Sequence, residues 1–521
     1  MQPHPHSPSH SPSHSPSPSP SDPWPRPSLD PADWDEFRAL GKQMIDDIAD
    51  HLAGIRDQPV WQQVPDAIAA SFRTGLPEVG LPMAEVYEEF RRTIRPFPRG
   101  NIHPRFWGWA NGSGVPVAAY GDLLASVINC TLGSGGNAAM MVEQQVIAWL
   151  GEALHWPGTG SGLLTSGASM GQVTALAAAR AARAPGFREE GAAASGIQFT
   201  VYGSTETHHS IEKAVELLGI GGRFFRRIPV GTGFRIDVAA LRAAIRADRA
   251  AGLQPLCLVG NAGTVNTGAV DPLADLLAIA REEDLWYHVD GAFGAFAQLL
   301  PSHRPLLDGM TEADSLVLDL HKWLYMPFDV SCLLTRRDGD LESAFRSGAD
   351  YISKTAQGPA AFPLAFSDRG VEQSRRFRAL KVWFALKTYG IRTFADSIAG
   401  NIAQVAHLVK LVEAADDLEL AARSDLNVAC FRYVWPGAAP EALDRVNRAV
   451  LDRLQTEGIA MPSHTVLDGR FVLRVANNNH RSAAADFDHL VMEVRRLGAA
   501  YAAAEDGRDR HVRAGENRVH P

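Results

Sequence analysis

Four groups of polar side chains stand directly after apolar, strand-like runs of this sequence. They are Asp290 after residues 285–289, His321 and Lys322 after residues 315–318, His208 and Ser210 after residues 199–202, and the turn Ser166-Gly-Ala-Ser169 after residues 162–165. Open α/β sheets bind ligands beyond the carboxyl ends of their strands. These four groups are therefore the first candidates for a functional site.

Lys322 has the most specific chemistry of this set. It follows an apolar run and is flanked by Trp323, Leu324 and Tyr325, so we expect its amine to be partly desolvated. A lysine in such a setting is suited to Schiff-base chemistry with a carbonyl compound. A pyridoxal-phosphate enzyme needs this amine, a carboxylate on the ring nitrogen and a cradle for the phosphate.

Three of the other residues fit the remaining needs of that cofactor. Asp290 is placed to be the carboxylate that keeps the ring nitrogen protonated. The turn Ser166-Gly-Ala-Ser169 begins a predicted helix and offers backbone N–H groups and hydroxyls to a phosphate, helped by the helix dipole. His208 could lie flat on the ring. The pattern predicts pyridoxal phosphate as cofactor.

The elements that must position these residues alternate along the chain. Between about residues 90 and 390, apolar strand-like runs alternate with helical stretches rich in Ala and Leu. Such alternation is typical of a parallel sheet wrapped by helices. After Arg378 a long helical stretch leads into strand-like runs at residues 427–433 and 471–475, which predict a smaller α+β region.

The ends of the chain differ in composition from this central part. The first 31 residues hold 11 of the 33 prolines and little that is apolar, so we expect a disordered arm. Apolar residues at helical spacing from Trp34 to Leu52 predict an amphipathic helix. The predicted organisation is an arm at 1–31, a helical segment at 32–95, a large domain at 96–385, a small domain at 386–505 and a loose polar tail at 506–521.

Composition excludes several classes of protein. A net charge of −9 argues against a protein that mainly binds nucleic acid or anionic lipid. The four cysteines are far apart without C-x-x-C spacing, so neither a disulfide framework nor a metal ribbon is indicated. No apolar run approaches the ~20 residues that span a bilayer, and no signal-peptide centre is seen. We expect a cytoplasmic protein without a structural metal.

In combination and order, these motifs resemble the group II pyridoxal-phosphate-dependent amino-acid decarboxylases, the family of aromatic-L-amino-acid decarboxylase. The resemblance covers roughly residues 34 to 500. It is carried by the segments 103–107 (HPRFW), 166–169 (SGAS), 208–210 (HHS) with Glu212, 288–290 (HVD) and 321–323 (HKW).

The resemblance implies a fold type I enzyme of the aspartate-aminotransferase kind, with a mostly parallel seven-stranded sheet. It also implies a homodimer whose N-terminal helices wrap the partner subunit. In that family pattern Lys322 binds the cofactor aldehyde, Asp290 pairs with the pyridine nitrogen and His208 stacks on the ring. The other implied cofactor contacts are Ala168, Ser169, His321, Ala292 and Asn261.

Two more segments have implied roles in this family. The residues around His103-Pro104 form the substrate side-chain pocket, which here implies His103, Phe106, Trp107 and Trp109. The segment at residues 345–351 is similar to the loop whose tyrosine protonates the substrate carbon, which implies Tyr351 as the proton donor. Tyrosine at this position favours simple decarboxylation, whereas phenylalanine turns the family towards oxidative aldehyde formation.

Two residues depart from the pattern of the family. Asn261 stands where many relatives have threonine or serine, and Asp319 stands where asparagine is common. These departures leave the contacts on the phosphate side and the carboxylate side open.

Rival interpretations remain at this stage. The run Gly167-Ala-Ser169-Met-Gly171 also matches a nucleophile elbow, so a serine hydrolase with Ser169, Asp290 and His321 is an alternative. That alternative explains neither Lys322 nor His208. A non-catalytic relative would be expected to lack Lys322.

The substrate also stays open. The tryptophan-rich segment argues for an aromatic amino acid such as tryptophan, phenylalanine, tyrosine or dihydroxyphenylalanine. Enzymes of the family also act on glutamate, diaminobutyrate, histidine or cysteine sulfinate. Arg474 stands where fold-related aminotransferases hold a carboxylate, and its role here is left open.

Overall fold

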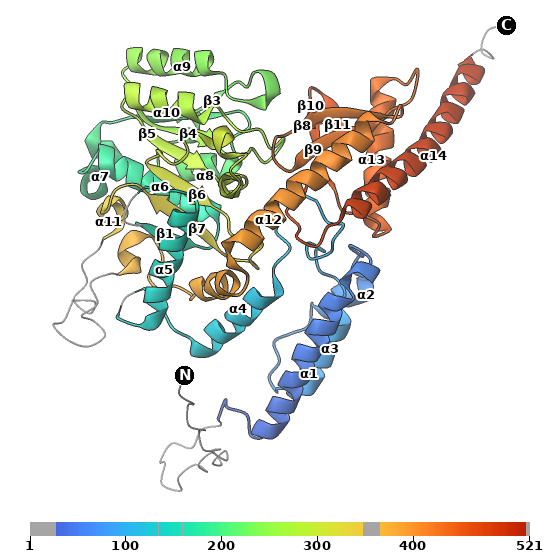
Figure 1. Cartoon of the computed structure of the whole chain (residues 1–521), viewed down its shortest axis with the longest axis horizontal. Helices are drawn as coiled ribbons and strands as arrows, with labels where there is room; N and C mark the ends of the chain where they lie inside the picture. The colour runs from blue at the N-terminus through green and yellow to red at the C-terminus, as the bar shows by residue number, and fades with distance from the viewer. Residues whose placement is uncertain (1–27, 134, 158–160, 347–364, 517–521) are drawn as a thin grey trace, which may run out of the picture.

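A computed structural model describes residues 28–133, 135–157, 161–346 and 365–516 of the chain. It contains two β-sheets, each covered by helices, and an N-terminal group of helices that projects from the body (Figure 1). No helix of these described ranges is long and apolar enough to cross a membrane.

The larger sheet has seven strands in the order β1-β7-β6-β5-β4-β2-β3. Strands β2 to β6 run parallel to one another, and β7 pairs antiparallel with both β1 and β6. The strands are β1 (Gly162–Thr165), β2 (Phe199–Ser204), β3 (Phe225–Ile228), β4 (Gln254–Asn261), β5 (Trp286–Asp290), β6 (Ser315–Leu318) and β7 (Ser331–Thr335).

The sequences of most of these strands are continuous apolar runs, because helices cover both faces of the sheet. Almost every residue of β1, β2 and β4 to β7 is buried, as expected of a largely parallel sheet between helices. The covering helices include α5 (Ala138–Ala153), α6 (Ala168–Arg183), α8 (His209–Leu217), α9 (Val238–Ala250) and α10 (Leu273–Glu282).

The smaller sheet is antiparallel in the order β10-β11-β9-β8. Its strands are β8 (Leu418–Arg423), β9 (Val428–Tyr433), β10 (Ser463–Leu467) and β11 (Arg470–Ala476), and α13 (Pro440–Thr456) and α14 (Ala484–Glu516) accompany them. Residues 506–516 therefore lie in α14, where the sequence predicted a loose tail. The polar composition was misleading because Ala and Arg favour helix.

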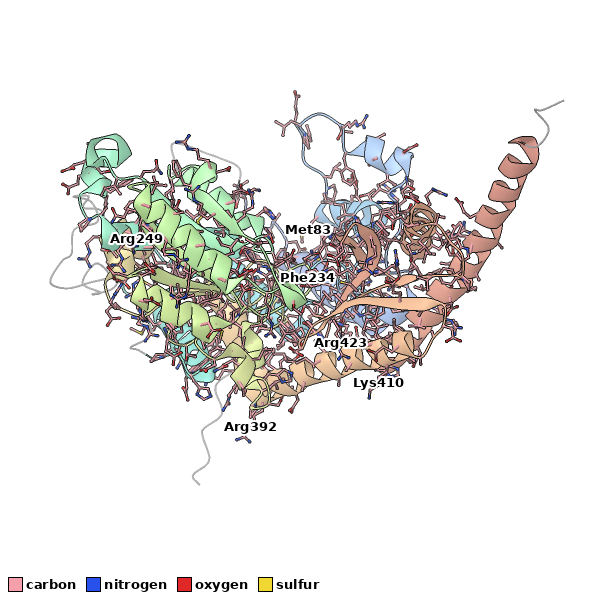
Figure 2. The ribbon with its side chains drawn as sticks, turned by 90° about the horizontal axis from the view of Figure 1, so that it is seen from above. Met83, Phe234, Arg249, Arg392, Lys410 and Arg423 are labelled. Atoms are coloured by element: carbon pink, nitrogen blue, oxygen red, sulfur yellow. The ribbon has the colours of Figure 1, made fainter. Side chains whose placement is uncertain are left out.

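Helix α12 (Ala379–Glu413) joins the two parts. Seen from above, Arg392 and Lys410 mark its course from the large sheet to the small one (Figure 2). It is interrupted at Gly390, whose φ of 71° is a left-handed conformation that glycine adopts without strain. Trp323 and Tyr325 both bond to Asn401 on this helix, which ties the segment after β6 to α12.

The N-terminal helices are α1 (Trp34–Ala53), α2 (Asp66–Ser71) and α3 (Met83–Thr93), followed by α4 (Pro116–Ile128). The predicted amphipathic helix is present as α1, and Asp33 caps it by accepting from the amides of Asp35 and Glu36. The Tyr87 hydroxyl donates to Asp47, which holds α3 against α1. Much of the arm predicted at 1–31 lies outside the described residues.

Candidate active site

A cavity of about 140 Å³ lies at the carboxyl ends of the central strands of the large sheet. All four predicted strand-end groups line this cavity. They contribute Asp290, the pair His321 and Lys322, the pair His208 and Ser210, and the turn from Gly167 to Ser169. The residues that line it are Gly167, Ala168, Ser169, His208, Ser210, Asn261, Gly263, Thr264, Val265, Asp290, Ala292, Phe293, Asp319, His321 and Lys322.

Lys322 follows β6 in a tight turn, in which its amide donates to the carbonyl of Asp319. Its side chain is 19% exposed, and its Nζ lies 2.8 Å from Oδ2 of Asp319. Burial opposes ionisation of Asp319, but the positive charge of Lys322 holds the pKa of its carboxyl below the ordinary value. The cavity therefore contains an accessible amine held by a buried carboxylate.

Asp290 is the last residue of β5 and is almost fully buried. Its Oδ1 accepts a hydrogen bond of 3.1 Å from the amide of Ala292. Burial raises the pKa of this carboxyl, and the nearby charge of Lys322 opposes the rise. Asp290 is thus a carboxylate that gains from a cationic partner.

The two histidines of the cavity are held as neutral rings at neutral pH. His208 caps α8, with Nδ1 2.8 Å from the Ser210 hydroxyl, and burial and Lys322 lower its pKa to about 4. Burial also lowers the pKa of His321, whose Nδ1 lies 2.9 Å from the carbonyl of Val330. Neither ring adds a positive charge to the site.

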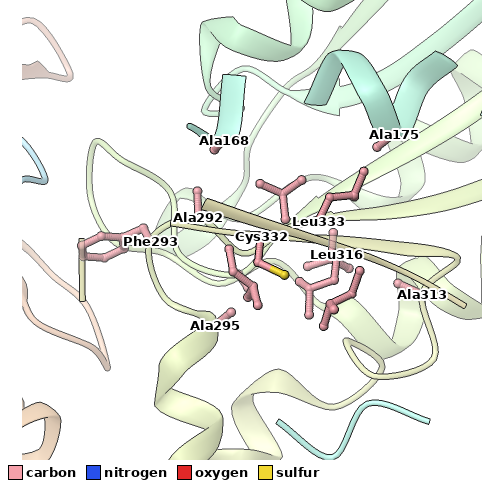
Figure 3. Close-up of a cluster of buried hydrophobic side chains, with 14 of the residues drawn as sticks. Ala168, Ala175, Ala292, Phe293, Ala295, Ala313, Leu316, Cys332 and Leu333 are labelled. Carbon is pink, nitrogen blue, oxygen red and sulfur yellow. The ribbon is translucent and has the colours of Figure 1, made fainter. Parts of the chain in front are cut away.

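The first turn of α6 forms one wall of the cavity. Amide groups at a helix start point outwards and lack partners within the helix. The amide of Ala168 donates to Oδ1 of Asp319 at 2.8 Å. Figure 3 shows Ala168 and Ala292 within a cluster of buried apolar side chains that includes Leu316 and Cys332. This apolar packing holds Ala168 and Ala292 in place in the wall of the cavity.

Asn261 is bound into a network at the end of β4. Its Nδ2 donates to Oδ2 of Asp271 at 2.6 Å and to the Thr207 hydroxyl at 3.1 Å. Asp271 also accepts from the amides of Ile236 and Asn261. Asn261 therefore joins the loop after β2 to the loop after β4 while it lines the cavity.

The four residues predicted for the substrate pocket do not line this cavity. Trp107 is fully buried in the core of the C-terminal part, where its ring stacks on Phe487 at 4.6 Å and its Nε1 donates to the Ser482 hydroxyl. Trp107 therefore does not line the described cavity, and its role in a substrate pocket stays a prediction. A core aromatic of this kind was the more ordinary interpretation of a tryptophan.

Phe106 and His103 are also buried away from the cavity. Phe106 packs against Val60 and Met461, and the ring of His103 accepts at Nδ1 from the amide of Arg105. Phe106 joins the N-terminal segment to the segment before the small sheet, and the place of both residues in a substrate pocket stays a prediction.

Trp109 differs from these three because 44% of it is exposed. Its φ is 55°, and the guanidinium of Arg99 lies 3.9 Å from the centre of its ring. Its carbonyl accepts a hydrogen bond of 2.7 Å from Arg474. A role of Trp109 in substrate binding stays a prediction.

Arg474 is a buried residue of the site region whose role the sequence left open. Its guanidinium donates to the carbonyls of Asn266 at 2.8 Å and Trp109 at 2.7 Å, and to the carbonyl of Val265. Burial lowers its pKa to about 10, so it stays charged at neutral pH. Arg474 thus clamps the main chain beside the cavity.

Gly263, Thr264 and Val265 line the cavity but were missed by the sequence analysis. Their signal was their place directly after the strand-like run at 256–259. Tyr351 lies outside the described residues.

The hydrolase alternative is not favoured by the geometry. The contacts of the His321 ring nitrogens in the described part of the chain are the Val330 carbonyl and the Asp319 carboxylate, rather than Ser169 or Asp290. Within the described residues, no group of three or more His, Cys, Asp and Glu side chains is placed to hold a metal ion.

The donor set fits pyridoxal phosphate. The cavity combines an accessible amine, a buried carboxylate for a ring nitrogen, a neutral imidazole and the start of a helix for a phosphate. Asp319 is already engaged by Ala168 and Lys322, which leaves Asp290 as the carboxylate for the ring nitrogen.

Comparisons with known proteins agree with this fit. The model of the pyridoxal-dependent decarboxylase conserved domain matches residues 65–434. An aromatic-L-amino-acid decarboxylase of Bacillus atrophaeus is 33% identical over 89% of this chain and 95% of its own length. A phenylacetaldehyde synthase of Petunia hybrida is 30% identical over 89% of this chain and 93% of its own.

Solved structures share the fold. The tryptophan decarboxylase of Catharanthus roseus, solved with L-tryptophan, superposes with a TM-score of 0.81 at 27% identity and covers 91% of this chain and 100% of its own. A TDC of Oryza sativa, solved with PLP and tryptamine, superposes with a TM-score of 0.84 at 28% identity. The match covers 91% of this chain and 99% of the other. Together with the donor set of the cavity, these matches show that the chain belongs to the pyridoxal-dependent decarboxylase family and is a fold type I enzyme that uses pyridoxal phosphate.

Proposed function

We propose that this protein removes the α-carboxylate of an aromatic L-amino acid and releases CO2 and the corresponding amine. The observation that carries the choice of substrate is the charge of the cavity. Lys322 is the one cation among the described residues that line it. A substrate with an acidic side chain, such as glutamate or cysteine sulfinate, finds no second counter-ion there.

Arg474 supports the same choice. It is the buried cation beside the cavity, and its donors are engaged by the carbonyls of Val265, Asn266 and Trp109. Moving it to a substrate carboxylate would leave these buried carbonyls without their donor, which is costly. The relatives named above, an aromatic-L-amino-acid decarboxylase and a tryptophan decarboxylase, add weight to an aromatic substrate.

The proposed roles of the site residues follow from their positions. Bound pyridoxal phosphate supplies a sink for the electrons of the broken carbon–carbon bond. Lys322 binds the cofactor and exchanges with the substrate amine. Asp290 holds the proton of the ring nitrogen, since its buried carboxylate gains from a cationic partner. His208 packs on the ring as a neutral imidazole.

The phosphate end is proposed at the start of α6. Ala168 and Ser169 offer the outward-facing groups of the first helical turn, and the ring of His321 lies close to Gly167 in the same wall. Ala292 and Asn261 complete the contacts through the ends of β5 and β4.

Tyr351 is proposed as the acid that protonates the carbon from which CO2 leaves. The support is the similarity of residues 345–351 to the family loop. A phenol can deliver this proton, whereas phenylalanine cannot. Among the relatives is a phenylacetaldehyde synthase, so aldehyde formation is the second candidate activity, and tyrosine at position 351 favours the amine.

We also propose that the enzyme is a cytoplasmic homodimer. Apolar side chains are exposed on α1 and α3, which project from the body in Figure 1, and on α4, which packs against α12, and patches of this kind mark interaction surfaces. They are Trp34, Phe37 and Ile48 of α1, Val86 and Phe90 of α3, and Leu123, Leu124, Val127 and Ile128 of α4. A second copy of the chain is the proposed partner.

The proposed domains are 32–95, 96–385 and 386–505. Two buried clusters support the division of the last two: one is centred on the large sheet and reaches one face of the small sheet, and the other lies between the small sheet and its helices.

The product profile of the purified protein tests the activity. Tryptophan, phenylalanine, tyrosine and dihydroxyphenylalanine are each incubated with the enzyme under air, beside glutamate, diaminobutyrate, histidine and cysteine sulfinate. We expect CO2 and one amine per turnover from at least one aromatic substrate. Turnover of only the acidic or basic substrates would refute the aromatic assignment.

Tyr351→Phe separates the two candidate activities. We expect the variant to form less amine and to release aldehyde, ammonia and peroxide instead. If it makes amine at the parental rate without peroxide, Tyr351 is not the proton donor.

A further inference from the structure

The cavity carries two carboxylates but one ammonium group. Asp290, Asp319 and Lys322 line it, and its two histidines have lowered pKa values that keep them neutral at neutral pH. Counted with both carboxyl groups and the amine ionised, the wall in one chain has a formal charge of −1. A phosphate group that enters this cavity adds further negative charge close to a carboxylate.

Asp319 lies where this conflict is strongest. Its Oδ1 accepts from the amide of Ala168 at 2.8 Å, the first amide of α6, and from the Ser331 hydroxyl of β7. Its Oδ2 pairs with Lys322 at 2.8 Å. The carboxylate thus occupies one of the donors that a helix start offers to an anion.

An asparagine at this position could keep the amide contact without the charge. The side-chain oxygen of asparagine accepts from an amide as a carboxylate does. The contacts of Asp319 therefore do not require a negative charge, except for the ion pair with Lys322. Lys322 would change its position relative to Asp319 on binding the cofactor aldehyde, so that pair would not by itself fix the charge of Asp319.

We propose that binding of the cofactor is coupled to protonation of Asp319. In the protein without cofactor, the Asp319 carboxylate binds the first amide of α6, and it takes up one proton when the phosphate group binds. This inference rests on the proposed use of the cavity for pyridoxal phosphate and adds a residue that tunes the affinity. Asp319 is a positioning residue of the phosphate site.

The sign of the pH dependence follows from the neighbours of Asp319. Lys322 and His321 face it from its own turn, Ser331 from β7 and Ala168 from α6, while Asp290 and His208 are the other titratable groups of the cavity. Without cofactor, the charge of Lys322 holds the pKa of Asp319 below the ordinary value. A neighbouring phosphate raises that pKa, so binding takes up a proton and the affinity falls as pH rises.

Titration of the full-length protein, stripped of its cofactor, tests the proposal. Pyridoxal phosphate is added between pH 6 and pH 9, and its absorbance gives the dissociation constant at each pH. One linked proton changes the constant by up to about tenfold per pH unit. We expect Asp319→Asn to lose that share of the pH dependence and to bind pyridoxal phosphate at least about tenfold more tightly than the wild type at pH 8.5.

Two controls test whether the effect depends on the phosphate group of the ligand and on the position of the substitution. Pyridoxal lacks the phosphate group, so Asp319→Asn should change its binding much less, whereas an effect through Lys322 alone would change both ligands alike. Asp416→Asn, in the exposed turn after α12, should match the wild type. Melting curves report that each variant is folded.

Three results would overturn the proposal. They are equal pH slopes for wild type and Asp319→Asn, weaker binding of pyridoxal phosphate by the folded variant, or equal gains for pyridoxal and pyridoxal phosphate. Failure of the wild type itself to bind pyridoxal phosphate would instead refute the use of the cavity for this cofactor.

Discussion

The cavity and the helices α1, α3 and α4 differ in whether their side chains have partners within the chain. In the cavity, the charged groups have partners close by, as Lys322 has in Asp319. On α1, α3 and α4, large apolar side chains such as Val127, which is 77% exposed, face outwards. The cavity is held by contacts within one chain, whereas the exposed apolar side chains are typical of an interface with a second chain. Changes in the cavity should therefore alter chemistry, and changes on the helices should alter assembly.

The largest effect is expected from Lys322→Ala. The change removes the amine that binds the cofactor, so decarboxylation and the fixing of cofactor to protein by borohydride should both be abolished. The particle mass should stay that of the wild type, because the helical surface is untouched. Full activity in this variant would disprove the assignment of the site.

A deletion through Leu52 should act on the other region. Loss of α1 removes Trp34, Phe37 and Ile48 and the partner of Tyr87, so we expect aggregation or inactive protein in size-exclusion chromatography. Deletion of residues 1–27 is the matched control and should leave mass and activity unchanged. A stable and active monomer from the longer deletion would contradict the proposed dimer.

Asp290→Asn should lower the rate without changing the assembly. The variant keeps the shape of the side chain but loses the charge that holds the proton of the ring nitrogen. Losing one such electrostatic contact typically costs about 10²–10³-fold in rate. The measurement is the rate at saturating cofactor, and a near-normal rate would show that another carboxylate has this role.

A smaller effect concerns stability in acid. Burial lowers the pKa of His103 and of His208 to about 4, so the folded protein prefers both rings neutral. Unfolded histidines bind protons from about pH 6.5 downwards. The stabilisation is therefore present above pH 6.5 and is lost as pH falls towards 4. The melting temperature should fall over this window.

His103→Gln sharpens this prediction. The variant removes one of the histidines whose pKa is lowered by burial, without touching the cavity, so its melting temperature should depend less steeply on pH, whatever its absolute value. An unchanged slope in His103→Gln would show that this ring does not titrate with unfolding.

Several features were predictable from neighbouring residues alone. Apolar runs that end in Asp290, His208 and Lys322 indicated strands and their ligand-binding ends, and the spacing from Trp34 to Leu52 indicated α1. Strands β3 and β7 were not anticipated. β3 contains two arginines, and β7 begins a few residues after the site, so neither reads as an isolated apolar run.

Other features depended on segments that meet only in the folded chain. The amide of Ala168 and the carboxylate of Asp319 are 151 residues apart in sequence, and Arg474 reaches the carbonyl of Trp109 across 365 residues. The burial of Trp107 was not visible in the sequence for the same reason, because its partner Phe487 also comes from a distant segment of the chain.

By itself the sequence determined which residues could do the chemistry and which strands would carry them, because strand periodicity and chemical type are local properties. The tertiary structure alone decided which carboxylate faces the amine, which tryptophan is core and where the buried arginine donates, because burial, charge pairing and pKa depend on the neighbours that folding brings together.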